Sequence, residues 1–205
     1  MLSLKFKHCA CALFFGSLFF LHSLFAKPVS SDFENCSVLS QQQEWFSAFS
    51  FCLRAAKEGD PVAQFLVAFA YRNGQGIETD LGKAVLWYQR AADQELPEAQ
   101  YNLGMLYDEG IGVSQDYGIA FYWFRKAASS GRARAQHNVG HMYLLGQGVA
   151  QSNVNAYMWF YIASSTGYLD SKRALEITKN LMSDADVNRA TQMAYHCISK
   201  KFKNC

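Results

Sequence analysis

Residues 84–92 read AVLWYQRAA, and the same pattern returns 36 positions later as AFYWFRKAA at residues 120–128 and again as AYMWFYIAS at residues 156–164. The alanines and aromatic residues keep their spacing without a gap or insertion, so the chain contains an internal repeat of 36 residues. Within each copy the apolar residues recur three or four positions apart. This spacing predicts one face of an amphipathic helix.

A second helix completes each unit. AQYNLGMLY at residues 99–107 matches AQFLVAFAY at residues 63–71 and AQHNVGHMY at residues 135–143, and it also has helical spacing. A Gly-x-Gly pair follows each copy, where the chain has to turn through conformations that glycine reaches cheaply. We therefore expect an all-α solenoid of 36-residue helix pairs.

The two ends of the repeat array are irregular. Residues 27–42 lack the repeat pattern, so we expect an extended leader there, and the solenoid is predicted to run over residues 43–181. Ser183 is followed three residues later by Asp186, which resembles a capping box at the start of a helix. Residues 182–205 are therefore predicted to form a C-terminal capping helix with a basic tail, which covers the open end of the stack.

Residues 1–26 have the layout of a secretory signal peptide. Lys5 and Lys7 precede an apolar run over residues 9–25, and Ala26 supplies the small residue at the cleavage site. We predict cleavage after Ala26 and an exported bacterial protein, either periplasmic or secreted. An uncleaved membrane anchor is the alternative, which the shortness of the apolar run disfavours.

The net charge of the chain excludes some classes of binding partner. The chain has 19 Lys and Arg residues against 17 Asp and Glu residues, and the loss of Lys5 and Lys7 with the signal leaves 17 of each sign. A balanced charge argues against a nucleic-acid surface and against binding to anionic membranes. The predicted partner of the mature chain, which we expect to be a monomer, is a protein or peptide.

Four cysteines remain once the signal is removed, and an even number in an exported chain indicates disulfide bonds. Cys36 and Cys52 lie near one end of the array, whereas Cys197 and Cys205 lie near the other. Because the ends of a solenoid are far apart, we predict the bridges Cys36–Cys52 and Cys197–Cys205. Free thiols or a metal site are the alternatives, and the absence of a Cys-x-x-Cys pair disfavours the metal site.

These motifs resemble a known family. WYQRAA at residues 87–92, AQYNLGMLY at residues 99–107 and GIGVSQD at residues 110–116 are similar to the Sel-one-like repeat, a relative of the tetratricopeptide repeat. The resemblance implies a right-handed α/α superhelix that serves as an adaptor or interaction scaffold. It also implies an exported bacterial type, because residues 182–205 resemble the closing helix of such members.

The sequence contains few features that would indicate an enzyme. Cysteine-rich members of the family have been described as β-lactamase-like, but their disulfides lie inside every repeat, and the internal repeats here contain no cysteine. A β-lactamase-like or penicillin-binding protein is therefore the alternative function, and a purely structural envelope protein is a third. We predict no catalytic residues, no cofactor and no metal site.

One histidine pair allows a sharper hypothesis. His137 and His141 are four residues apart on a predicted helix, so both rings could face one metal ion. The same two positions hold bulky residues in the other repeats, and no third ligand stands at a convincing position. Packing or polar contacts are the simpler interpretations.

Positions that differ between repeats are the candidates for partner binding. Tyr122, Arg125, Met158 and Tyr161 lie beside the packing face of the first helices, and they are of the residue types that dominate interface energetics. The alternative is that this stripe packs against the neighbouring repeat. The adjacent pair Leu144–Leu145, at positions that are polar in other repeats, is a second candidate surface.

Overall fold

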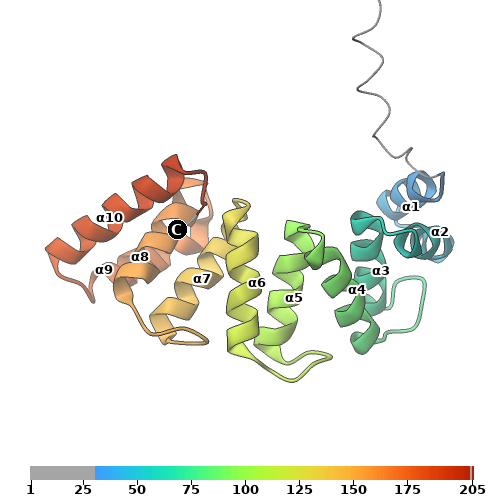
Figure 1. The fold of residues 1–205 in the computed structure, drawn as a ribbon, viewed down its shortest axis with the longest axis horizontal. Coiled ribbons are helices and arrows are strands. Elements are labelled where there is room, and N and C mark those ends of the chain that lie inside the picture. The colour runs from blue at the N-terminus through green and yellow to red at the C-terminus, as the bar shows by residue number, and fades with distance from the viewer. Residues whose placement is uncertain (1–30, 204) are drawn as a thin grey trace, which may run out of the picture. The chain divides into compact units, whose positions relative to one another are not determined.

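The computed structural model describes residues 31–203 and 205, and in this part of the chain it contains ten α-helices and no strand (Figure 1). The predicted signal peptide, residues 1–26, lies outside the described residues. The helices, in chain order, are α1 Ser31–Gln41, α2 Trp45–Lys57, α3 Pro61–Asn73, α4 Leu81–Asp93, α5 Pro97–Glu109, α6 Tyr117–Ser129, α7 Ala133–Leu145, α8 Asn153–Ser165, α9 Leu169–Lys179 and α10 Asp184–Ser199. None of the described helices has the length and apolar character that crossing a bilayer requires.

From α1 to α9, successive helices pack against each other, which is the arrangement of a solenoid, and α10 packs against α8. The first helices of the units are α2, α4, α6 and α8, and the second helices are α3, α5, α7 and α9. The predicted all-α solenoid of helix pairs is therefore confirmed.

Local signals fix where the helices begin and end. Asp80 and Asp116 accept hydrogen bonds from the backbone amides of Lys83 and Ile119, at 2.9 Å in both cases, and so cap α4 and α6. Ser152 caps α8 in the same way. The second helices α3, α5 and α7 end at glycines in the left-handed conformation.

The second glycine of each Gly-x-Gly pair lies in a loop that returns to its own repeat. Gly112 has φ +73°, and a Cβ there would lie 2.7 Å from the carbonyl oxygen of Leu81, the first residue of the same repeat's first helix. Gly148 approaches the carbonyl of Tyr117 in the same manner. These positions need glycine both for the backbone conformation and for the close approach.

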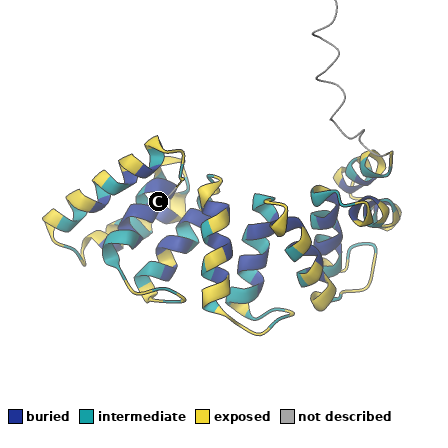
Figure 2. Cartoon of the chain, viewed as in Figure 1, coloured by how far each residue is buried: buried dark blue, intermediate teal, exposed yellow. Residues whose placement is uncertain are grey.

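The core includes alanine and tryptophan columns that are identical in the repeats. The column Ala84, Ala120 and Ala156 is fully buried, and Trp87, Trp123 and Trp159 are almost so. Figure 2 shows the buried residues on the helix surfaces that face neighbouring helices. Close packing depends on small residues: a Cβ at Gly104 would lie 2.7 Å from the ring of Phe124.

The prediction of an extended leader over residues 27–42 is wrong for its described part. Residues 31–41 form α1, which packs against α2. The helix buries Cys36 completely and half-buries Phe33 and Leu39, so its apolar face has only one residue per turn. Such a thin stripe is hard to distinguish from an irregular polar segment.

The C-terminal end has the predicted capping helix. Ser183 accepts a hydrogen bond from the amide of Asp186 and donates one to its carboxylate, which starts α10. The helix packs on α8 and buries Ala190 and Ala194 (Figure 1). It covers the side of α8 that no further repeat occupies.

Candidate functional site

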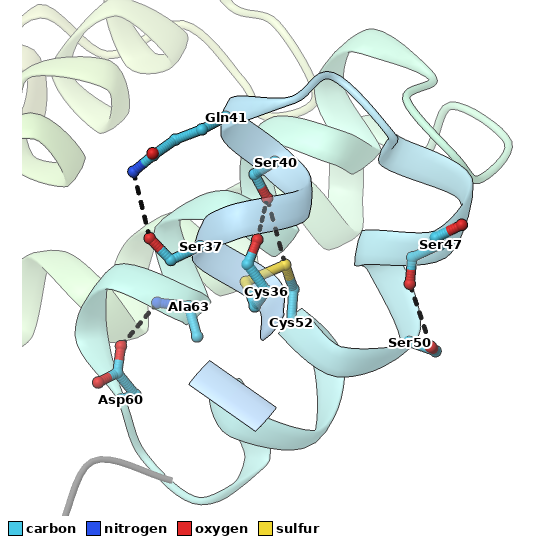
Figure 3. The surroundings of a disulfide bond; sticks show 9 residues. All are labelled: Cys36, Ser37, Ser40, Gln41, Ser47, Ser50, Cys52, Asp60 and Ala63. Carbon is cyan, nitrogen blue, oxygen red and sulfur yellow. Dashed lines mark hydrogen bonds between the residues drawn. A yellow bond between two sulfur atoms is a disulfide. The ribbon is translucent and has the colours of Figure 1, made fainter. Parts of the chain in front are cut away.

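Both ends of the described helix array are closed by disulfides. Cys36 of α1 is bonded to Cys52 of α2, with Cα atoms 4.7 Å apart, and Cys197 of α10 is bonded to Cys205, with Cα atoms 5.3 Å apart. Figure 3 shows Ser40 beside the first bridge, where its hydroxyl donates to the carbonyl oxygen of Cys36 at 2.6 Å. The bridges are those that the cysteine positions predict.

The four residues predicted to bind a partner do not form one open surface. Tyr122 is 51% exposed, and its ring meets Trp123 edge-on. Met158 is only 4% exposed, so the prediction that it contacts a partner is wrong for this structure. It lies in a hollow whose wall includes Met193 and His196 of α10.

The other two predicted residues contact the C-terminal segment of the same chain. Tyr161 donates a hydrogen bond from its hydroxyl to that of Tyr195 on α10, at 2.8 Å. Arg125 lies over the Trp159 ring, 5.0 Å from its centroid, and donates to the backbone carbonyl of Cys205. The stripe in the last two repeats is thus largely covered by α10 and the residues that follow it.

The residues after α10 fold back over α6 and the turn that follows it. Lys201 and Phe202 have positive φ values, which reverse the chain direction. Phe202 lies against Gly131, where a Cβ would be 3.2 Å from its ring. Sequence reasoning missed this contact because the tail is outside the repeat and carries no periodic signal.

The second-helix face has two further hollows. One of about 480 Å³ lies among α3, α5 and α7, and its lining includes Phe65, Tyr101 and Arg134, with Tyr168 from the loop before α9. A second hollow of about 350 Å³ lies between α5 and α7 and also includes Tyr101. The sequence pointed to this face only through the Leu144–Leu145 pair, and Leu145 lines the second hollow. Sequence reasoning missed the larger hollow, although Phe65 and Tyr101 are 36 residues apart and mark a column of large side chains.

His137 and His141 belong to the same face, in a mainly structural setting. Nδ1 of His137 lies 2.9 Å from the hydroxyl of Ser171, and its ring is 5.3 Å from those of Phe160 and Tyr168. Burial lowers the pKa of His137, which favours the neutral imidazole. The described residues hold no group of three potential metal ligands.

The Leu144–Leu145 pair divides between two environments. Leu145 is 52% exposed and lines the hollow between α5 and α7, whereas Leu144 is half-buried. Asp108 and His141 line the same hollow. The pair therefore adds apolar area at one end of the second-helix face.

Comparison with known proteins agrees with this geometry. A solved structure of a protective antigen from uropathogenic Escherichia coli with an SLR fold matches at a TM-score of 0.70 and 29% identity, covering 76% of this chain and 34% of that one. A Sel1 repeat protein from Oxalobacter formigenes matches at 0.69 and 27%, covering 78% and 66%. This chain thus spans about a third of the first protein and just under two thirds of the second.

No curated protein sequence matches the chain. The sequence model of the Sel1 repeat family matches three consecutive segments, residues 61–96, 97–131 and 133–168, which together make up just over half of the chain. These segments coincide with second helices followed by the first helix of the next unit. The chain belongs to the Sel1 repeat family.

Proposed function

We propose that this protein is an exported scaffold that holds a protein or peptide partner on its repeat surface. Sel1 repeat proteins are generally protein-interaction scaffolds. We propose in addition that this chain is exported and that it binds a specific partner.

One observation carries the proposal: the shared alanine and tryptophan columns are buried, while two of the three residues in the differing column Leu86, Tyr122 and Met158 are exposed. The alanine column at Ala84, Ala120 and Ala156 is fully buried, whereas Leu86 is 62% and Tyr122 51% exposed. Packing therefore accounts for the common residues, and exposed apolar side chains at variable positions are left for recognition.

Two further observations support export. The described part of the chain has two disulfides, and such bonds persist in oxidising compartments and are rare in the reducing cytosol. A neighbour in structure is described as a protective antigen, which fits a protein exposed outside the cell. With the signal pattern in residues 1–26, these features favour a periplasmic or secreted location.

The enzymatic alternative has no such support. The matched structures are described as an antigen with an SLR fold and as a Sel1 repeat protein. The variable positions at the surface include large apolar side chains such as Leu86 and Tyr122, which suit contact with another protein better than acid–base chemistry.

The test is crosslinking in cells that express the tagged full-length protein, followed by quantitative mass spectrometry. We expect specific partner proteins, absent from a matched exported control, and a mature N-terminus at Lys27. If crosslinking recovers no species above that control, the scaffold function is wrong. Recovery of Met1 at the N-terminus of envelope protein would overturn the export part.

A further inference from the structure

We propose that the trough across α3, α5 and α7 binds an acidic internal segment of the partner polypeptide, with a carboxylate side chain in the larger hollow and a bulky apolar residue beside it. This inference rests on the proposed scaffold function and gives it a site and a ligand chemistry. We call the larger hollow the acidic trough site, after the ligand that it would hold. Its lining consists of Phe65, Glu98, Tyr101, Asn102, Arg132, Ala133, Arg134 and Tyr168.

The floor of the acidic trough site is aromatic and held in place. The ring of Phe65 lies 5.6 Å from that of Tyr88, and the ring of Tyr101 lies 5.8 Å from that of Phe124, both partners being buried. Phe65, Tyr101 and Tyr168 are themselves only half-buried. Fixed, half-exposed rings offer apolar area to a ligand at little entropic cost.

The rim of the site carries positive charge that the described residues leave unmatched. Arg132 pairs with Glu98, but Arg134 and the nearby Arg72 have no carboxylate within salt-bridge distance in the described part of the chain. Arg72 instead donates to Oδ1 of Asn102 at 3.1 Å. Both guanidinium groups act on Tyr101. A guanidinium group without a carboxylate partner, next to an apolar floor, is complementary to a carboxylate.

Two features of the backbone add to this attraction. The first turn of α7, which begins at Ala133 beside the site, has no side-chain cap. Its amide groups and the helix dipole therefore favour an anion at this end. The acidic groups nearby are Glu98, which pairs with Arg132, Glu109, whose charge acts on Tyr101, and Asp170, which lies next to Tyr168 and acts on His137.

The trough continues past the site, which is why we infer an internal segment rather than a chain end. Tyr101 also lines the second hollow, which reaches Asp108 and His141. Asp108 lies ten positions after Glu98 in α5, which is a distance of about 15 Å at the helical rise. That length accommodates about four or five residues of extended chain.

The charge changes sign along the trough. At one end Arg132 and Arg134 outnumber Glu98, while Asp108 stands at the other end. A segment with acidic residues throughout would meet repulsion at Asp108. The preferred ligand is therefore acidic at one end only.

The experiment is selection of a random dodecapeptide phage library on the full mature protein with its disulfides intact. We expect Asp or Glu next to Phe, Tyr, Trp or Leu in the selected peptides. For the most enriched peptide, labelled with fluorescein, Arg134→Glu should weaken binding at least tenfold by fluorescence anisotropy. Arg134→Lys should retain most of the affinity.

Lys57→Glu is the matched control, because it makes the same charge change on an exposed residue of α2, away from the trough. It should change affinity less than twofold. Arg134→Glu leaves the fold intact on physical grounds, since an exposed acidic residue in the first turn suits the helix dipole. Circular dichroism of the Arg134→Glu variant checks that its helix content and fold are unchanged.

Three results would overturn the acidic trough site. They are selected peptides without acidic enrichment, binding unaffected by Arg134→Glu, and a library that yields no binder. If crosslinking still recovers a partner in any of these cases, the scaffold function stands and only the site is wrong. Loss of binding on Tyr122→Ala, with Arg134→Glu silent, would assign recognition to the first-helix stripe.

Discussion

Arg125 of α6 donates a hydrogen bond to the backbone carbonyl oxygen of Cys205, 80 positions later in the sequence. The same guanidinium lies over the ring of Trp159. One side chain thus joins an internal repeat, the next repeat and the C-terminal segment. The solenoid otherwise relies on contacts between neighbouring helices.

Removing this guanidinium should loosen the C-terminal segment without unfolding the repeats. In Arg125→Met the cation–π contact and the hydrogen bond are lost, while the disulfide to Cys197 still tethers the segment. Hydrogen exchange followed by mass spectrometry should show faster exchange for residues 198–205 and unchanged exchange in α4 and α5. Lys126→Met, an exposed neighbour, is the control and should leave the segment protected.

The two disulfides should stabilise the protein by similar but unequal amounts. The cysteines are 16 residues apart in Cys36–Cys52 and 8 residues apart in Cys197–Cys205. For these loops the chain-entropy relation gives about 3 kcal/mol and about 2.5 kcal/mol, respectively. Paired Cys→Ala variants, compared by urea unfolding, measure both contributions. Equal stability of wild type and the Cys36→Ala/Cys52→Ala variant would contradict the closed N-terminal end.

Gly104→Ala should destabilise the fold although alanine favours helices. A Cβ would lie 2.7 Å from the ring of Phe124, and the forced shift of a buried ring costs about 1–3 kcal/mol. The gain in helix propensity offsets about 1 kcal/mol of this. Gly82→Ala, at an exposed position of α4 where a Cβ would make only an ordinary contact 3.6 Å from Oδ1 of Asp80, should instead be neutral or stabilising. Thermal and urea unfolding compare the pair.

Stability should depend on pH through His137. Burial and the charge of nearby His141 lower its pKa in the folded state, while Asp170 opposes them. Below about pH 6.5 the unfolded chain therefore binds a proton at this histidine more readily than the folded chain does. The contribution of His137 to stability is thus fully present above this pH and is lost as the pH falls below it. His137→Phe introduces the residue type that stands at the equivalent position 65. This variant should make the urea midpoint less dependent on pH between pH 5 and 7.

The control for the histidine prediction is His196→Gln, on the exposed side of α10. Its urea midpoints should keep the wild-type dependence on pH. An unchanged slope in His137→Phe would assign the dependence to other groups.

The repeat made most of the fold predictable. Ala84 and Trp87 recur at a fixed period, so one pattern specifies the helices, their order and the buried face. Asp80 and Asp116 were identifiable as caps because each stands directly before an apolar helical pattern. Periodicity and capping are local properties, and a sequence displays them directly.

The surface was predicted less well because it depends on contacts between distant segments. Met158 shares a column with the exposed Tyr122, but α10 covers it. Nothing in the sequence fixes which helix the C-terminal segment reaches, so the contact of Arg125 with Cys205 was not predictable. The trough was missed because Phe65 and Tyr101 look like core residues in a repeat column, and their half-exposure follows from packing alone.

The loop of Gly112 closes onto Leu81 of its own repeat rather than onto the next one. Each 36-residue unit therefore carries its own loop contact, and duplication or deletion of a whole unit leaves those contacts complete in every remaining unit. A lineage can lengthen or shorten such an array in single steps without inventing new junctions. The capped ends then stay the same while the area available for recognition grows by one unit at a time.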